Sequence, residues 1–156
     1  MKVQVKRHRK KTTIKVGNQS ITMIDPAKAQ DEEIARFLFP EMTEAIDRIM
    51  KPIYTEGREK WPRPGQDANG RSTGRSYSEF RYDVFVSGKG VLTARIANPA
   101  VNPRDGYAYP YSVGYQGGRG KTYWSRDFTK PFRRSKKKTL KDLTATYRRI
   151  LERANG

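Results

Sequence analysis

The chain has 156 residues, a formal net charge of +17 and no cysteine. This length is enough for one domain with a buried core and too short for two comfortable ones. The lack of cysteine excludes disulfide bonds and thiolate metal sites, and the lack of a signal peptide or of an apolar run of about 18 residues predicts neither secretion nor membrane insertion. We therefore expect an intracellular protein, or part of a particle that is assembled inside a cell.

The positive charge lies at the two ends of the chain. Residues 1–30 carry eight Lys or Arg against one acid, residues 119–156 carry thirteen against three, and residues 31–118 carry twelve of each. A neutral body with basic ends is typical of a protein that contacts a polyanion or an acidic protein surface, and a solvated basic surface without a partner is the alternative. The residues expected to make such contacts are Arg7, Arg9, Lys10, Lys11, Arg133, Arg134, Lys136, Lys137 and Lys138.

Residues 1–30 are predicted to form a basic arm or a hairpin, followed by a single α+β domain at residues 31–156. Two short runs that contain apolar residues, 13–16 and 21–23, flank a polar turn sequence, which favours the hairpin. A basic arm that folds only on binding has a similar sequence. Asp25 followed by Pro26 is typical of a helix start, with the acid as N-cap.

An amphipathic helix is predicted over about residues 31–60. Apolar residues recur every three or four positions from Ile34 to Tyr54, which places them on one stripe of the helix. Proline removes a backbone donor and clashes with the preceding turn, so we expect a kink or a break at Pro40. Residues 61–75 are rich in proline and glycine and are predicted to form a loop.

A β-hairpin is predicted over residues 76–98, because two alternating runs flank the turn sequence at 87–90. A second loop then leads into the stretch 107–118, which contains four tyrosines and three glycines. Tyrosine supplies a large contact area with a polar tip, and glycine lets another backbone come close. Interfaces are enriched in tyrosine, so this stretch is interpreted as a contact surface.

A second amphipathic helix closes the chain. Apolar residues recur at helical spacing from Leu140 to Ala154, the opposite face is basic, and Pro131 and Phe132 precede the helix. Together these elements predict an α+β fold, in which a small and mostly antiparallel sheet is packed by an N-terminal and a C-terminal amphipathic helix.

The residue types offer little for catalysis. His8 is the only histidine, and its neighbouring cations disfavour the protonated form. The acids between residues 31 and 60 alternate with Arg and Lys, and ion pairs within the helix explain them. We therefore expect no enzyme activity, no cofactor and no metal site.

Three short motifs follow one another in order along the chain, namely Thr73-Gly74 after the first helix, Tyr107-Ala108 at the start of the glycine-ending stretch, and Pro131-Phe132 before the last helix. Over about residues 31–152, this order resembles the small neck or tail-completion proteins of long-tailed bacteriophages. That family usually has an acidic residue soon after the Tyr-Ala pair, whereas this chain has Gly114 there.

The resemblance implies a structural virion protein of the head-tail connector, a subunit of a ring around the DNA channel that joins or completes the tail. Its implied partners are further copies of itself, adjacent neck, portal-side or tail-tube proteins, and the DNA in the channel, with no membrane. A closed ring needs two different contact patches on each copy. The residues expected at the subunit interface are Tyr107, Tyr109, Tyr111, Tyr115, Gly117, Gly118, Pro131 and Phe132.

Two alternatives stay open. One is a small nonspecific nucleic-acid-binding protein, because the basic ends supply affinity for phosphates and the aromatic side chains can stack on bases. The other is a tail terminator or head-closure ring subunit, which differs from the first reading only in which ring the protein occupies.

Overall fold

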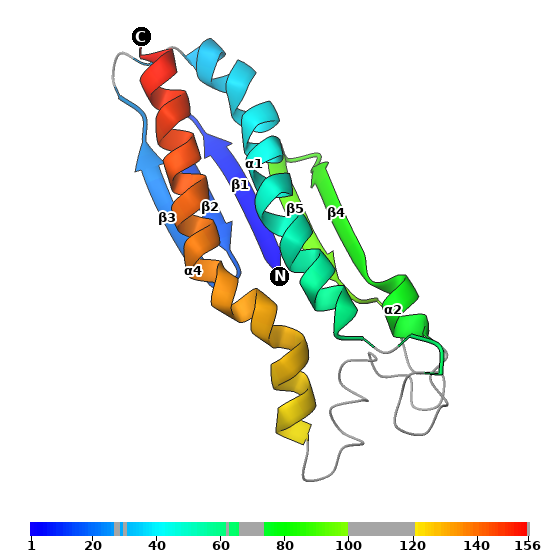
Figure 1. Ribbon diagram of the computed structural model, residues 1–156. Helices are drawn as coiled ribbons and strands as arrows, with labels where there is room; N and C mark the ends of the chain where they lie inside the picture. Colours follow the sequence, from blue (N-terminus) through cyan, green and yellow to red (C-terminus); the bar gives the residue numbers. More distant parts are fainter. Residues whose placement is uncertain (27–28, 30, 62, 66–73, 100–120, 156) are drawn as a thin grey trace. The chain divides into compact units, whose positions relative to one another are not determined.

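The computed structural model describes residues 1–26, 29, 31–61, 63–65, 74–99 and 121–155, without the side chains of Ser76 and of residues 121–129. This part of the chain forms an antiparallel sheet from two groups of strands, with helices after each group, and this α+β arrangement confirms the predicted fold class (Figure 1). The elements are β1 (Lys2–His8), β2 (Lys11–Val16), β3 (Gln19–Ile24), α1 (Asp31–Glu59), α2 (Arg75–Glu79), β4 (Arg81–Val86), β5 (Val91–Ala97) and α4 (Lys121–Ala154).

The chain forms two compact units. The first contains Met1–Lys51, Asp83–Arg95 and Ser135–Gly156, and the second contains Pro52–Tyr82 and Ile96–Arg134. Helices α1 and α4 each contribute residues to both units. The predicted boundary at residue 30 lies inside the first unit.

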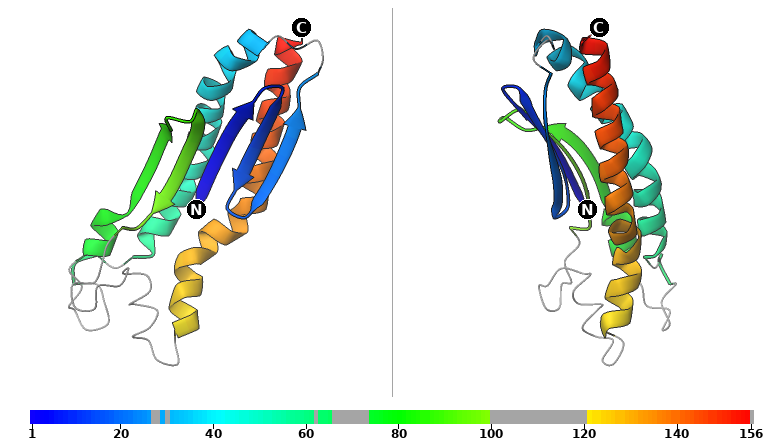
Figure 2. Two further views of the ribbon diagram at one scale, coloured as in Figure 1. Left: turned by 180° about the vertical axis from the view of Figure 1, so that it is seen from behind. Right: turned by 90° about the vertical axis from the view of Figure 1, so that its left-hand side faces the viewer.

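The described strands form one five-stranded sheet in the order β3-β2-β1-β5-β4 (Figure 2). Strand β1 pairs antiparallel with both β2 and β5, so that Val5 lies opposite Ile14 on one side and Leu92 on the other. Strands β2 and β3 form the predicted hairpin, with Val16 opposite Gln19 across a turn in which Gly17 has a positive φ of 60°. Strands β1, β2 and β3 are thus the middle and one edge of the sheet, and the predicted hairpin lies within it.

The two faces of the sheet differ because successive side chains of a strand point to opposite sides. On β1 and β2 the covered face carries the buried side chains of Val3, Val5, Ile14 and Val16 together with Thr12 and Arg7, and the residues between them are polar and mostly exposed. The buried side chains of the central strands, each at most 1% exposed, are Val3, Val5, Ile14, Val16, Leu92 and Ala94.

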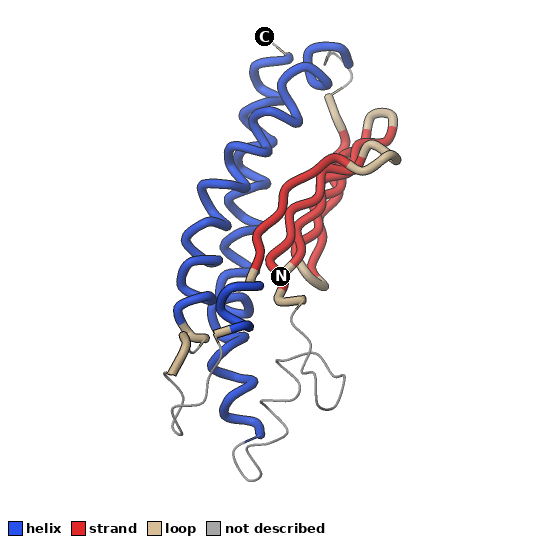
Figure 3. The backbone as a smooth tube through the Cα atoms, turned by 90° about the vertical axis from the view of Figure 1, so that its right-hand side faces the viewer, coloured by secondary structure: helices blue, strands red, loops and turns tan. Residues whose placement is uncertain are grey.

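Helices α1 and α4 cover this apolar face in the first unit, and no described element covers the opposite face (Figures 2 and 3). Their buried positions recur every three or four residues, as one stripe of a helix requires. These core residues are Ile34, Leu38, Met42, Ala45, Ile46 and Met50 from α1, and Leu143, Tyr147, Ile150, Leu151 and Ala154 from α4.

Both long helices extend through prolines. Helix α1 continues through Pro40 and Pro52, so the predicted alternative of two separate pieces is wrong. Both prolines are exposed, and the buried residues on either side of Pro40, such as Leu38 and Met42, hold the stripe against the sheet. Helix α4 begins at Lys121 and contains Pro131, so this proline lies inside the last helix and not before it.

The second predicted hairpin is present as β4 and β5, but its first residues are helical. The short helix α2 occupies Arg75–Glu79, after Gly74 in the left-handed conformation with φ 70°. A Cβ on Gly74 would lie 2.4 Å from the ring of Pro64, so only glycine fits this turn. The turn between β4 and β5 closes with a hydrogen bond from the Ser87 N–H to the Val91 carbonyl at 2.9 Å.

We expect Ile46→Ala to lower the free energy of unfolding by about 2–5 kcal/mol, because it removes fully buried methyl groups and leaves a cavity under α1. Ile49 lies on the same helix and is only partly buried, so Ile49→Ala is the matched control and should cost clearly less. Urea unfolding followed by circular dichroism measures both. Equal losses would contradict the assignment of the buried stripe.

Candidate interaction surfaces

Arg7 lies on the covered face of the sheet and is neutralised there by two carboxylates. Its Nη2 atom is 2.7 Å from Oδ2 of Asp25 and 2.8 Å from Oδ1 of Asp31. The side chain of Asp25 is 1% exposed and that of Asp31 is 62% exposed. Arg7 therefore forms an internal ion pair, and the expectation that it contacts a polyanion is corrected.

Tyr147 completes this cluster from helix α4. Its hydroxyl donates a hydrogen bond to Oδ1 of Asp25 at 2.6 Å. Burial raises the pKa of Tyr147 to about 12, and the hydrogen bond to Asp25 acts in the same direction. The cluster links β1, the residue after β3, α1 and α4, so Asp25 stabilises the fold and is not the N-cap of α1.

The other cations predicted from the sequence lie in several places. Arg9 and Lys10 are exposed in the turn between β1 and β2, where Arg9 has a φ of 54°. On α4, Arg134 pairs with Glu56 and Lys138 pairs with Asp142. Lys136 is partly buried against Gly17, and Arg133 and Lys137 are exposed.

The open face of the sheet carries lysines that the sequence reasoning missed. Lys2 and Lys6 on β1 and Lys11 and Lys15 on β2 lie opposite to the covered face of their strands and are all exposed. Only Lys11 was among the residues predicted to contact a polyanion. The signal was present in the sequence, because each pair of lysines is four residues apart in an alternating run, which places both on one face of a strand.

The sheet has two open edges in the described part of the chain, and they differ in character. Strand β3 has no charged residue, and its last residue, Ile24, is 69% exposed. Strand β4 carries Arg81 and Asp83 and ends in Phe85 and Val86, which are 43% and 51% exposed. An uncharged open edge is a template for another strand, because its backbone N–H and C=O groups have no partner in the sheet.

Phe132 belongs to an aromatic cluster within the second unit. Its ring centroid lies 6.2 Å from that of Phe80, which in turn lies 5.5 Å from Tyr54 and 6.4 Å from Trp61. A Cβ on Gly57 would lie 2.5 Å from the Phe132 ring, which explains a glycine inside α1. Pro131 is buried, so the packing of the chain itself accounts for the predicted interface pair Pro131 and Phe132.

The predicted tyrosine contact surface lies outside the described residues. It contains Tyr107, Tyr109, Tyr111, Tyr115, Gly117 and Gly118. Its role at a subunit interface stays a prediction.

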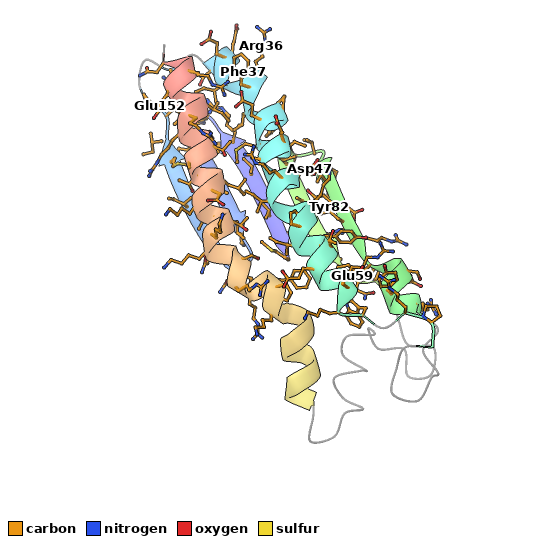
Figure 4. The ribbon with its side chains drawn as sticks, in the orientation of Figure 1. Arg36, Phe37, Asp47, Glu59, Tyr82 and Glu152 are labelled. Atoms are coloured by element: carbon orange, nitrogen blue, oxygen red, sulfur yellow. The ribbon has the colours of Figure 1, made fainter. Side chains whose placement is uncertain are left out.

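A groove of about 770 Å³ lies between α1 and α4 in the first unit. Three acids and three arginines line it, so it has no net charge, and Arg153 pairs with Glu41 across it. At its side the ring of Phe37 has the guanidinium carbons of Arg36 and Arg153 at 5.6 and 5.7 Å from its centroid (Figure 4). The lining residues are Glu41, Glu44, Ala45, Arg48, Thr146, Arg149, Glu152 and Arg153.

The described residues offer neither a metal site nor a membrane-spanning helix. No group of three or more His, Asp or Glu side chains there is placed to hold a metal ion. No described helix combines the length and the apolar composition needed to span a bilayer.

Comparisons with protein-family models, with curated proteins and with solved structures gave no match. The resemblance to phage neck proteins therefore depends on the order of the three motifs in the sequence.

We expect Asp25→Asn to lower the free energy of unfolding by about 3–5 kcal/mol, because it leaves the largely buried Arg7 guanidinium without its closest counter-charge. Asp31→Asn is the matched control, since Asp31 contacts the same Arg7 nitrogen from an exposed position, and it should cost at most about 1 kcal/mol. Urea unfolding at neutral pH measures both. Equal effects would show that burial does not set the strength of these pairs.

We expect the stability of the protein to fall between pH 10 and pH 12 in part through Tyr147. Its pKa is about 12 in the folded protein and about 10 when unfolded, so the unfolded chain loses this proton first as the pH rises. The contribution is complete below pH 10 and disappears as the pH passes 12. Urea unfolding across this range should show a smaller fall for Tyr147→Phe, and identical slopes would contradict the assignment.

Proposed function

We propose that this protein is a structural subunit of a ring in the neck of a tailed phage virion, where it joins or completes the tail around the DNA channel. The observation that carries the proposal is the pair of unlike open edges on one sheet. The order of the three motifs, which resembles that of neck and tail-completion proteins, supports it. Its partners are further copies of itself and the adjacent neck, portal-side or tail-tube proteins.

A ring forms when one patch of a subunit meets a different patch on the next copy. The two open edges meet this condition, because the edge of β3 is uncharged and the edge of β4 ends in exposed apolar side chains. Two copies of the same edge would instead give a closed dimer. Rings are therefore the expected product of pairing β4 of one copy with β3 of the next.

The directions of the two edge strands agree with this arrangement. Strand β2 is antiparallel to β1 and β3 is antiparallel to β2, so β3 points in the same direction as β1. On the other side β5 is antiparallel to β1 and β4 runs back along β5, so β4 also points in this direction (Figure 1). Rotation about a ring axis that is roughly parallel to the strands preserves this direction, and β4 would meet β3 as a parallel pair. Ile24, Phe85 and Val86 then lie at the same end of the new pair.

The backbone of β3 is free to form such a pair. The Asp25 N–H donates a hydrogen bond to the Lys10 carbonyl at 2.9 Å, so Asp25 and Lys10 form a hydrogen-bonded pair of the β2–β3 ladder. In an antiparallel ladder hydrogen-bonded and non-hydrogen-bonded pairs alternate. The backbone groups of Met23 and Ile21 are therefore hydrogen-bonded to β2, while those of Thr22 and Ser20 point to the open edge.

We expect the purified chain to form closed rings and Phe85→Ser to abolish them, because the variant removes the largest exposed apolar side chain of the β4 edge. Loss of such a side chain from the centre of an interface costs about 2 kcal/mol or more, which is roughly a thirtyfold loss of affinity. Native mass spectrometry and negative-stain images measure ring formation. Phe37→Ser is the matched control, because Phe37 is 36% exposed on α1, also beside arginine, and does not lie at an edge.

A second variant tests the opposite edge of the same contact. Thr22→Pro removes an N–H that points away from β2, so it should prevent ring formation and leave the β2–β3 hairpin intact. Thr22→Val keeps this N–H and should assemble. A chain that stays monomeric at all concentrations, or rings that form equally with Phe85→Ser, would contradict the proposal.

A further inference from the structure

We propose that the open face of the sheet binds the phosphate backbone of duplex DNA through Lys2, Lys6, Lys11 and Lys15, which we call the lysine face. This inference deepens the proposed function, since it names a partner of the neck subunit and takes its biological setting from that function. The binding surface itself follows from the register and charge of β1 and β2.

The register places the four lysines at even intervals. Lys15 lies opposite Gln4, midway between Lys2 and Lys6, and Lys11 lies opposite His8, two residues beyond Lys6. Successive lysines thus alternate between the two strands and advance by two residues, or about 6.6 Å. Phosphates of one strand of B-DNA advance by about 3.4 Å per base pair along the helix axis, so one lysine step corresponds to about two base pairs.

The charge of the lysine face is not compensated. None of its four lysines has an ion-pair partner among the described residues, whereas Lys138, Arg134 and Arg153 on α4 are each paired with an acid. Asp83 is the one acid that the described strands of the first unit carry on this face. Its Oδ2 atom lies 3.2 Å from Nη2 of Arg95, which neutralises it. An extended row of unpaired cations attracts a polyanion and releases its counterions.

The side chains around the lysines favour a duplex over a single strand. Gln4, Thr13, Ser20, Thr22 and Thr93 separate the lysines or flank them on the same face, and strands β1, β2, β3 and β5 contain no Phe, Tyr or Trp. Phe85 shares this face with Asp83, but it lies on β4, two strands from β1, and its ring centroid is 5.7 Å from the guanidinium carbon of Arg95. Proteins that bind single strands stack bases on aromatic side chains. Lysine contacts phosphate as a point charge without reading sequence, so the predicted binding is nonspecific.

The location of the lysine face agrees with the ring that we propose. Helices α1 and α4 cover the other face of the sheet in the first unit (Figure 3). A sheet that continues from copy to copy around a ring presents one face to the axis and the other to the outside. With the helices outside, the lysine face lines the channel that holds the DNA.

Fluorescence anisotropy with a labelled 20-base-pair duplex tests the inference on the full chain across 25–200 mM salt. Each phosphate contact contributes about 0.9 to the slope of log affinity against log salt, so Lys6→Gln with Lys15→Gln should lower the slope by about 1.8 and weaken binding several-fold. Lys137→Gln with Lys141→Gln is the matched control. It removes two exposed lysines of α4, with the same change in net charge, and should leave the slope nearly unchanged.

The possible outcomes separate the alternatives. Equal losses in the two double variants, or tighter binding to a single strand than to the duplex, would overturn the inference. Binding to polyglutamate without binding to the duplex would overturn it in favour of an acidic protein partner. If the first double variant does not fold, Lys2→Gln with Lys11→Gln removes the other two lysines and carries the same expectation.

Failure of this inference differs from failure of the proposed function. The Lys6→Gln and Lys15→Gln double variant should still form rings in native mass spectrometry, because the two positions lie on inner strands and not at the edges. Rings without duplex binding would refute the lysine face alone. Duplex binding by a strictly monomeric chain would refute the ring alone.

Discussion

The central position of β1 constrains the rest of the first unit. Because β1 pairs with β2 on one side and β5 on the other, a shift of one residue would turn its valines toward solvent and its lysines toward the helices. The burial of Val3 and Val5 under α1 and α4 therefore fixes the register of three strands. The same register sets the even spacing of the lysines on the opposite face.

Charge follows the same division between the two faces. Arg7 lies on the covered face, where Asp25 and Asp31 neutralise it and Tyr147 satisfies a second carboxylate oxygen. A buried charge of this kind is tolerated only when it is paired and hydrogen-bonded. The lysines on the open face have no such partners among the described residues. The net positive charge of the N-terminal residues is thus presented on one surface of the sheet.

A sheet with one covered face, one basic face and two unlike edges is well suited to assembly around DNA. In the ring that we propose, the edges would make heterologous contacts between copies, and the face between them would contact phosphate. These contacts use different residues, so assembly and binding to DNA can be changed separately by mutation. The contact surface expected from the tyrosine stretch at residues 107–118 stays a prediction.

The sequence by itself determined the elements that depend on neighbours close in the chain. The spacing of apolar residues predicted α1 and the C-terminal part of α4, and alternation with turn residues predicted the β2–β3 and β4–β5 hairpins. It also showed that the ends are basic, whereas the expected absence of enzyme activity stays a prediction.

Only the tertiary structure decided which cations are exposed and which are neutralised. Arg7 and Tyr147 meet through Asp25 although they are 140 residues apart, and β1 pairs with β5 about 90 residues later. It also decided that α4 begins at Lys121 and continues through Pro131, where Phe132 packs on Phe80. Such contacts form between segments that local patterns describe separately, so periodicity predicts a buried face without identifying what covers it.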